Sequence, residues 1–416
     1  MTESRSRTGI EGVRQFLPWF AMALGVLLLK APDALSHPQF WAEDGVIFFQ
    51  QQRTMGLGSL FHPYVDYLHF APRLAAMLAA VLPAWLVPLA YNAAAIGGGA
   101  FSLAWLCTRL RDGTNRLLFL AAALLSLTNG EIFGTLTNLQ WFLQLFLLGA
   151  CFAPAGQDGR WRTPTMLAMI LIASLTGPFS VLLLLAFGAA LAMCMLPDGW
   201  LPTLRLRAWL RGLDRPRLLV LAAGACVQLG VYFSHRTPGS SAMGAGEIAR
   251  HIGNVIQAHT FGGVLLPAPV ILLVLAGMLV MLLRQAHRGP LANDRFLLLA
   301  MAVLGLLQIA AGMAKMTIPL EIGVSDRYLF VFKLFFWTGL GMLLQGAFRS
   351  RVAVLAISLA TMGFIAINHP GYLRRAPLED KQWRTYAPAL DRGEKVDIPI
   401  NPTPWTIHVE ARKAVR

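Results

Sequence analysis

Apolar runs joined by short polar connections dominate the chain from residue 17 to residue 367. A membrane helix needs about 20 mostly apolar residues, and fewer where helices are short or broken inside a bundle. On this basis the pattern predicts about eleven membrane-spanning helices. They are expected at residues 17–29, 87–106, 117–127, 139–152, 165–175, 179–196, 218–233, 264–283, 296–313, 328–344 and 352–367.

The composition also indicates a membrane protein. The chain has 416 residues, of which 56% are hydrophobic and 13% are charged. A soluble domain is usually about 45–50% apolar and about 25% charged. The four cysteines all lie in apolar segments and lack the spacing of a disulfide framework or a metal site. We therefore expect an all-α polytopic membrane protein with free thiols in its core.

The charge of the chain reflects its topology. A net charge of +14 suggests nucleic-acid binding at first sight. The arginines, however, cluster in short connections between apolar runs, as they do between Arg205 and Arg217. This is the positive-inside pattern, so we attribute the charge to membrane topology and to contact with anionic lipids, and we expect no nucleic-acid partner.

Reading the basic connections as cytoplasmic divides the chain into three parts. Residues 1–16 are expected in the cytoplasm, residues 17–367 in the transmembrane domain, and residues 368–416 in a periplasmic tail. Arg374 and Arg375 conflict with this assignment, because basic residues after a membrane span favour the cytoplasm. A cleaved signal peptide is the alternative for the first apolar run, but Ala34-Leu35-Ser36 is a poor cleavage site.

The first periplasmic loop, residues 31–86, is long and is expected to carry surface helices. Residues 57–67 mix aromatic and polar side chains, which favours a position along the membrane surface. Residues 69–82 are apolar, but they are short for a span and are bounded by prolines. The basic connections leave room for only one crossing between this loop and Arg109, so residues 69–82 are predicted to stay on the outer face.

Polar chemistry concentrates in the predicted outer loops. The chain shows neither the internal repeat of many transporters nor ionisable residues at mid-span. The most distinctive stretch is FWAEDGVIFFQ at residues 40–50, in which Glu43 and Asp44 follow Trp41. A carboxylate beside aromatic rings at a membrane surface loses hydration, and its pKa tends to rise. This setting suits a general base or a metal ligand, and the simpler alternative is an interfacial loop whose acids face water.

At residues 17–196 the chain resembles the GT-C superfamily of membrane glycosyltransferases. The first helix leads into a long outer loop with the acidic pair Glu43-Asp44. The stretch His69–Leu74 is similar to the motif that opens a surface helix in these enzymes. A polar outer turn, TNGEIFGTLTN at residues 128–138, follows the third span, and Thr176-Gly177-Pro178 joins two short spans. Each motif is weak alone, and their order and loop placement carry the resemblance.

The resemblance implies an inverting glycosyltransferase that moves a sugar from a polyprenyl-phosphate carrier to a glycan or lipid acceptor on the periplasmic face. An acceptor hydroxyl needs a base within hydrogen-bond reach, and Asp44 is the first choice. Glu43 either shares that role or helps Asp44 to bind a divalent cation, Mg²⁺ or Mn²⁺. Inversion follows from a single displacement, because the sequence shows no second nucleophilic carboxylate.

The leaving lipid phosphate needs cations, and further outer residues could contact the donor. Arg73, Arg236, Lys315 and Arg327 are the candidate cations, and a lone arginine at the membrane edge more often contacts lipid headgroups. Asp326 would orient or neutralise Arg327, next to Tyr328. His69 could bind the donor phosphate or cap a helix. Asn138, Gln140 and Trp141 could bind the sugar, or could start a helix and anchor it at the interface.

Two other functions remain open on the sequence. An O-antigen polymerase or ligase would keep the outer arginines but would not need an acidic pair after the first helix. A lipid or glycan transporter or flippase would need no base, so substrate movement would survive the loss of Asp44.

Overall fold

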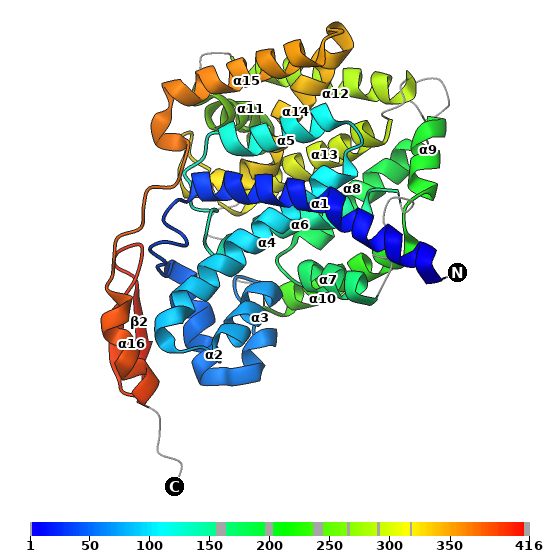
Figure 1. Ribbon diagram of the computed structural model, residues 1–416. Coiled ribbons are helices and arrows are strands. Elements are labelled where there is room, and N and C mark those ends of the chain that lie inside the picture. Colours follow the sequence, from blue (N-terminus) through cyan, green and yellow to red (C-terminus); the bar gives the residue numbers. More distant parts are fainter. Residues whose placement is uncertain are drawn as a thin grey trace.

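The computed structural model describes residues 2–154, 164–195, 203–235, 244–263, 267–288, 292–316 and 318–411, and it is mostly helical (Figure 1). Seven helical segments in this part of the chain are long and apolar enough to cross a membrane. They are Gly12–Lys30, Ala84–Arg109, Arg215–His235, Ala268–Ala286, Ala292–Lys315, Ser325–Ala347 and Arg351–Asn368. The helical, multi-pass membrane character predicted from the sequence is thus confirmed, with seven segments rather than eleven meeting these criteria.

The helices assemble into one bundle around a continuous apolar core. Helix α1 (Thr2–Lys30) packs against α4 (Val87–Arg109), and α4 packs against α6 (Gln140–Cys151). The other bundle helices are α5 (Gly113–Leu125), α7 (Pro164–Ser174), α8 (Phe179–Met193), α9 (Thr203–Arg211), α10 (Arg215–His235), α11 (Ala245–Phe261), α12 (Ala268–Arg288), α13 (Ala292–Lys315), α14 (Phe330–Ala347) and α15 (Arg351–Asn368).

The first loop folds into short helices on one end of this bundle. They are the π-helix η1 (Asp44–Phe49), α2 (Gln50–Met55), the 3₁₀ helix η2 (Gly56–Phe61) and α3 (Phe70–Ala79). With 10 residues, α3 is too short to cross a bilayer by itself, in keeping with the surface position expected for it. A further 3₁₀ turn, η3 (Ala84–Leu86), leads into α4.

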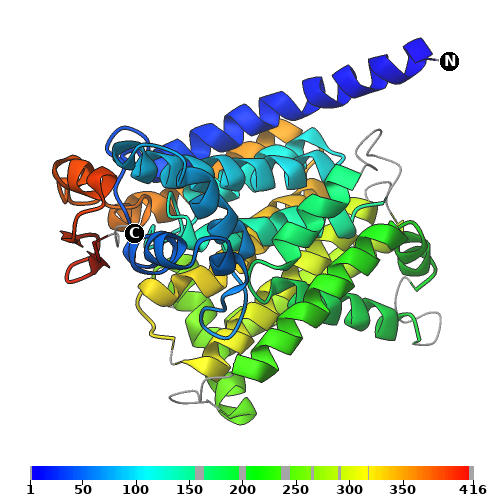
Figure 2. The same cartoon turned by 90° about the horizontal axis from the view of Figure 1, so that it is seen from below.

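The C-terminal tail forms a small unit of its own. Helix α16 (Trp383–Arg392) precedes two antiparallel strands, β1 (Val396–Pro399) and β2 (Thr406–Val409), in which Ile398 lies opposite Ile407. This unit covers η1: Asn401 pairs with Trp41 in an isolated bridge, and its carbonyl accepts the N–H of Ala42 at 2.5 Å. Figure 2 shows the first loop and the tail together at one end of the bundle, with the N-terminus at the other.

Arg375 joins the tail to the first loop. Its guanidinium is buried and donates to Asp33 Oδ1 at 2.7 Å and to the Phe133 carbonyl at 3.0 Å, while its backbone N–H donates to the Lys30 carbonyl. Gly130, with φ of +83°, lies so close that an added Cβ would be 2.4 Å from the Arg375 Cα. The tail and the first loop therefore occupy the same face of the bundle. Arg375 neutralises a buried carboxylate there.

Candidate functional site

A cavity of about 240 Å³ lies where the first loop meets the ends of four helices. It gathers most of the side chains that the sequence singled out, although they come from distant segments. The lining includes Glu43, His69, Asn138, Gln140, Trp141, Lys315, Arg327 and Tyr328. Asp44, Arg73 and Asp326 are not part of this lining, and Arg236 lies outside the described residues.

Glu43 is the acidic side chain of the lining. The hydroxyl of Tyr64, which also lines the cavity, donates to Glu43 Oε1 at 3.4 Å. Burial, together with the neighbouring Glu43 carboxylate, raises the pKa of Tyr64 to about 12. Tyr64 therefore stays protonated at neutral pH and can hold the carboxylate in place, leaving the other oxygen of Glu43 free to accept a proton.

Asp44 lies behind the cavity and holds the polar turn. Its carboxylate is 1% exposed and accepts the backbone N–H groups of Leu136 at 2.8 Å and Thr137 at 2.6 Å. Burial raises the pKa of Asp44 from 3.8 to about 8, against the lowering effect of these two hydrogen bonds. Asp44, the first choice of base on the sequence, therefore does not line the cavity, and of the acidic pair only Glu43 does.

His69 contributes a neutral imidazole to the cavity wall. Burial, together with the nearby guanidinium of Arg73, lowers the pKa of His69 to about 3. Its ring stacks on Tyr67 with a centroid distance of 4.8 Å, and its Nε2 lies 3.5 Å from Gln140 Nε2. A neutral ring can accept or donate a hydrogen bond, but it adds no positive charge for a phosphate.

The segment that carries His69 is joined to the Thr176-Gly177-Pro178 turn. The backbone N–H of Ala71 donates to Thr176 Oγ1 at 2.9 Å, and that of Gly177 donates to the Leu68 carbonyl. Gln228 of α10 bridges both segments, since its amide contacts Leu68 and the Gly177 carbonyl. Two motifs whose contacting residues, Ala71 and Thr176, are 105 positions apart in the sequence thus form one wall of the site. Sequence reasoning missed Gln228, whose signal is a lone amide within an apolar run.

Two cations line the cavity, and each is held by a carboxylate. Lys315 Nζ lies 2.8 Å from Asp66 Oδ2, and Arg327 Nη1 lies 2.7 Å from Glu131 Oε1. The side chains of Lys315 and Arg327 remain 41% and 28% exposed, so both keep donors for a ligand. Glu131 and Asp66 are both buried, and neither was singled out as a site residue from the sequence.

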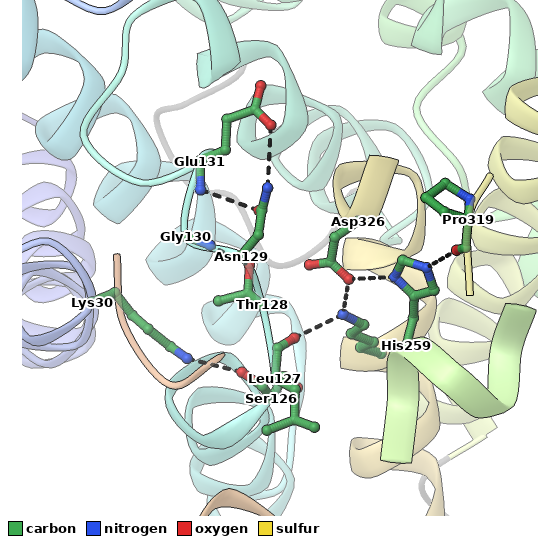
Figure 3. A network of polar contacts seen from close by, with 11 residues as sticks. Lys30, Ser126, Leu127, Thr128, Asn129, Gly130, Glu131, His259, Pro319 and Asp326 are labelled. Atoms are coloured by element: carbon green, nitrogen blue, oxygen red, sulfur yellow. Dashed lines mark hydrogen bonds and ion pairs between the residues drawn. The ribbon is translucent and has the colours of Figure 1, made fainter. Parts of the chain in front are cut away.

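Asp326 does not orient Arg327, in contrast to the expectation for it. Its Oδ1 contacts Lys333 Nζ and lies 2.9 Å from His259 Nδ1 (Figure 3). Lys333 Nζ also donates to the Leu127 carbonyl at 2.7 Å, and Lys30 Nζ donates to the Ser126 carbonyl at 2.9 Å. Lys333 is a buried residue in the first turn of α14, so an ionisable side chain lies within this helix, near its end and not at mid-span. The hydrogen bonds from the two lysines hold the start of the segment 126–131, which carries Glu131.

Arg73 is buried beneath the first loop. Its Nη2 donates to Gln51 Oε1 at 2.9 Å, and its guanidinium lies 5.4 Å from the Phe48 ring centroid. Burial lowers its pKa to about 10, so it remains a cation. From this position it acts on His69 and does not contact a ligand in the cavity, which differs from the donor contact expected from the sequence.

The residues do not fit the divalent cation suggested by the acidic pair. The carboxylates of Glu43 and Asp44 do not converge, because Asp44 is occupied by two backbone N–H groups. Within the described part of the chain, no cluster of three or more His, Cys, Asp or Glu side chains could hold a metal.

Comparison with known proteins adds no family assignment. No protein-family model, curated protein or solved structure matches the chain.

Proposed function

We propose that the chain is an inverting glycosyltransferase of GT-C type in the bacterial inner membrane. It would move a sugar from a polyprenyl-phosphate carrier to a glycan or lipid acceptor on the periplasmic face. The observation that carries this proposal is the cavity itself, whose lining at the end of a membrane bundle holds one carboxylate, Glu43, and two cations, Lys315 and Arg327. Acceptor activation and phosphate departure need these two kinds of group on opposite sides of one sugar.

In the proposed reaction, Glu43 takes the proton of the acceptor hydroxyl as its oxygen attacks the anomeric carbon. The bond between that carbon and the phosphate oxygen breaks, and the lipid phosphate leaves with both bonding electrons. Arg327 and Lys315 stabilise the charge that develops on the phosphate, and Arg327 offers the planar donors that suit it. Attack from the side opposite the leaving group inverts the configuration at the anomeric carbon.

The remaining lining groups suit a sugar. Trp141 is an aromatic residue of the lining, and Gln140 carries a buried Oε1 without a hydrogen-bond partner. Asn138 donates its amide to the Glu131 carbonyl and to Thr135 Oγ1, which leaves its oxygen as an acceptor for a hydroxyl. An aromatic face with a few placed polar groups is the usual lining of a site that fixes a small ligand.

The proposal also sets the topology. The helices α5, α6, α7 and α8, each 11–15 residues long, would complete the eleven crossings inside the bundle. The first loop and the tail would then lie in the periplasm, with the N-terminus in the cytoplasm. In this arrangement the cavity would lie at the periplasmic surface of the inner membrane, where a membrane-borne donor and a periplasmic acceptor can meet.

A transfer assay tests the proposal. Purified protein in detergent is offered a panel of polyprenyl-phosphate sugars with a membrane lipid extract, and wild type is compared with Glu43→Gln. We expect Glu43→Gln to lower turnover by about 10²–10⁴-fold, the usual contribution of a general base. The control variant is Glu394→Gln, which removes an exposed acid of the tail and should leave turnover unchanged.

Three outcomes would contradict the proposal. Turnover that survives Glu43→Gln would show that Glu43 is not the general base. Turnover lost in Arg327→Ala but retained in Glu43→Gln would favour the polymerase or ligase. Binding of carrier lipid with no turnover of any donor, together with lipid movement across vesicles, would favour the transporter or flippase.

A further inference from the structure

One face of helix α13 borders the polar cavity and changes from charged to uncharged along its length. Gln308, Ala311 and Lys315 line the cavity at intervals of three and four residues, which places them on one stripe of the helix. Gln308 and Lys315 are about 10 Å apart along the helix axis. The side chain of Lys315 is 41% exposed, whereas Gln308 is 1% exposed. The cavity therefore extends into the bundle, with Lys315 at its outer end and Gln308 deeper inside.

A chain of side-chain amides from α6 holds Gln308. Gln144 Nε2 donates to the Trp141 carbonyl at 3.0 Å, and Gln308 Nε2 donates to Gln144 Oε1. Because a carbonyl oxygen only accepts, Gln144 must turn its –NH₂ group to Trp141 and its oxygen to Gln308. Gln308 must then turn its own –NH₂ group to Gln144. These contacts fix the orientation of the Gln308 amide and leave its Oε1 as an acceptor for another group.

Three buried polar atoms of the lining have no hydrogen-bond partner among the described residues. They are Gln308 Oε1, Gln140 Oε1 and the indole Nε1 of Trp141. All three residues line the cavity, and we refer to them together as the uncharged lining. A buried polar group without a partner is unfavourable, so a ligand that supplies the missing hydrogen bonds gains affinity. The uncharged lining thus has two acceptors and one donor for a ligand in the cavity.

We infer that the sugar of the donor is a single neutral unit with free hydroxyl groups, and that Gln308 selects it by accepting a hydrogen bond from one hydroxyl. This inference deepens the proposed function and rests on it. Sugar hydroxyls donate to the two amide oxygens, and a sugar oxygen accepts from the indole N–H of Trp141.

The charge and the size of the cavity support this class of sugar. The uncharged lining offers no cation to a sugar carboxylate and no anion to a sugar ammonium, so burying either charge against it is unfavourable. The cavity volume of about 240 Å³ is below the range of about 300–1,000 Å³ for sites of drug-sized ligands, which suits one sugar unit.

The test measures the binding of donors that differ at one position. Purified protein in detergent is titrated calorimetrically with farnesyl-phosphate conjugates of several hexoses and pentoses. The tightest of these, the parent ligand, is then compared with analogues that lack one hydroxyl or carry a carboxylate or an amine in its place. We expect at least one deoxy analogue, and both charged analogues, to bind about 10–100-fold more weakly than the parent ligand.

Gln308→Leu separates selection from a structural role. The substitution removes the acceptor and keeps a side chain of similar size, so the parent ligand should bind about 10–100-fold more weakly. The deoxy analogue that lacks the contacted hydroxyl should keep its affinity, because it does not make that hydrogen bond. A structural defect would weaken both ligands equally. Gln144→Leu leaves Gln308 in place but unoriented, and it should reduce the discrimination by a smaller factor.

Gln345→Leu is the matched control. It removes a comparable side-chain hydrogen bond, from Gln345 Nε2 to Asn115 Oδ1 at 2.7 Å, and neither residue lines the cavity. The affinities for the parent ligand and for its analogues should both stay unchanged.

Several results would overturn the inference. They are equal affinity of the wild type for the parent ligand and all its deoxy analogues, tighter binding of a charged analogue, equal losses for both ligands in Gln308→Leu, and no binding of any conjugate. Selective binding without sugar transfer by the wild type would keep the sugar site and defeat the proposed function. Sugar transfer without discrimination among the analogues would do the reverse, so the two failures are distinguishable.

Discussion

Arg375 and Asp33 form a buried ion pair, with Nη2 and Oδ1 2.7 Å apart, that links the C-terminal tail to the first loop. The guanidinium of Arg375 also donates a hydrogen bond to the Phe133 carbonyl. Because Arg375 follows the last helix of the bundle and Asp33 follows the first, the pair closes the fold at the end where the candidate site lies.

Removing one partner of this ion pair should lower the stability of the folded protein. Arg375→Ala leaves Asp33 buried without its cation, and the free energy of unfolding should fall by about 3–5 kcal/mol. Unfolding in mixtures of SDS and mild detergent measures the change. Arg392→Ala, which breaks an exposed ion pair of α16, is the control and should have no measurable effect. Equal effects of the two substitutions would contradict a structural role for the Arg375 pair.

Asp44→Asn should lower stability rather than act directly on the chemistry. An asparagine places an N–H₂ group against one of the N–H donors of Leu136 and Thr137, so one hydrogen bond is lost inside the protein. The expected cost is about 1–3 kcal/mol, measured by the same unfolding assay. Asp397→Asn, at an exposed site of β1, serves as the comparison. Full stability of Asp44→Asn with complete loss of turnover would instead restore Asp44 as a candidate base.

The pH dependence of stability should also report on Asp44. Because burial raises its folded-state pKa to about 8, the folded protein keeps the proton that the unfolded chain releases near pH 3.8. The stabilisation is complete below pH 3.8 and is lost as the pH rises to about 8. The melting temperature of the wild type should therefore fall relative to that of Asp44→Asn over this range. Parallel pH profiles for the two proteins would show that Asp44 is ionised in the fold.

Asp326→Asn should destabilise the bundle, because it leaves Lys333 as a buried cation without its carboxylate. The expected loss is about 3–5 kcal/mol. Adding Lys333→Met to Asp326→Asn removes the uncompensated charge and should recover part of this loss, so a double-mutant cycle gives the coupling between the two side chains. Additive effects of the two substitutions would show that the contact drawn in Figure 3 contributes nothing to folding.

The sequence by itself determined the class of the protein and the position of its chemistry. Long apolar runs must form helices in a membrane, because hydrocarbon offers no partner for backbone N–H and C=O groups. Apolar length therefore located helices such as α4 and α13 without any tertiary information. Basic connections and polar outer segments pointed to one end of the bundle, and the cavity that contains Glu43, His69 and Arg327 lies at that end.

Only the tertiary structure decided which residues of that end act together. Local sequence does not determine which of two adjacent acids lines a cavity. At the start of the π-helix η1, the side chain of Glu43 lines the cavity, whereas that of Asp44 accepts the backbone N–H of Leu136. Nor does local sequence pair Arg327 with Glu131, 196 positions earlier. Ion pairs and cavities depend on which helices become neighbours. That choice comes from packing over the whole chain, whereas a helix in a membrane is fixed by its own length and polarity.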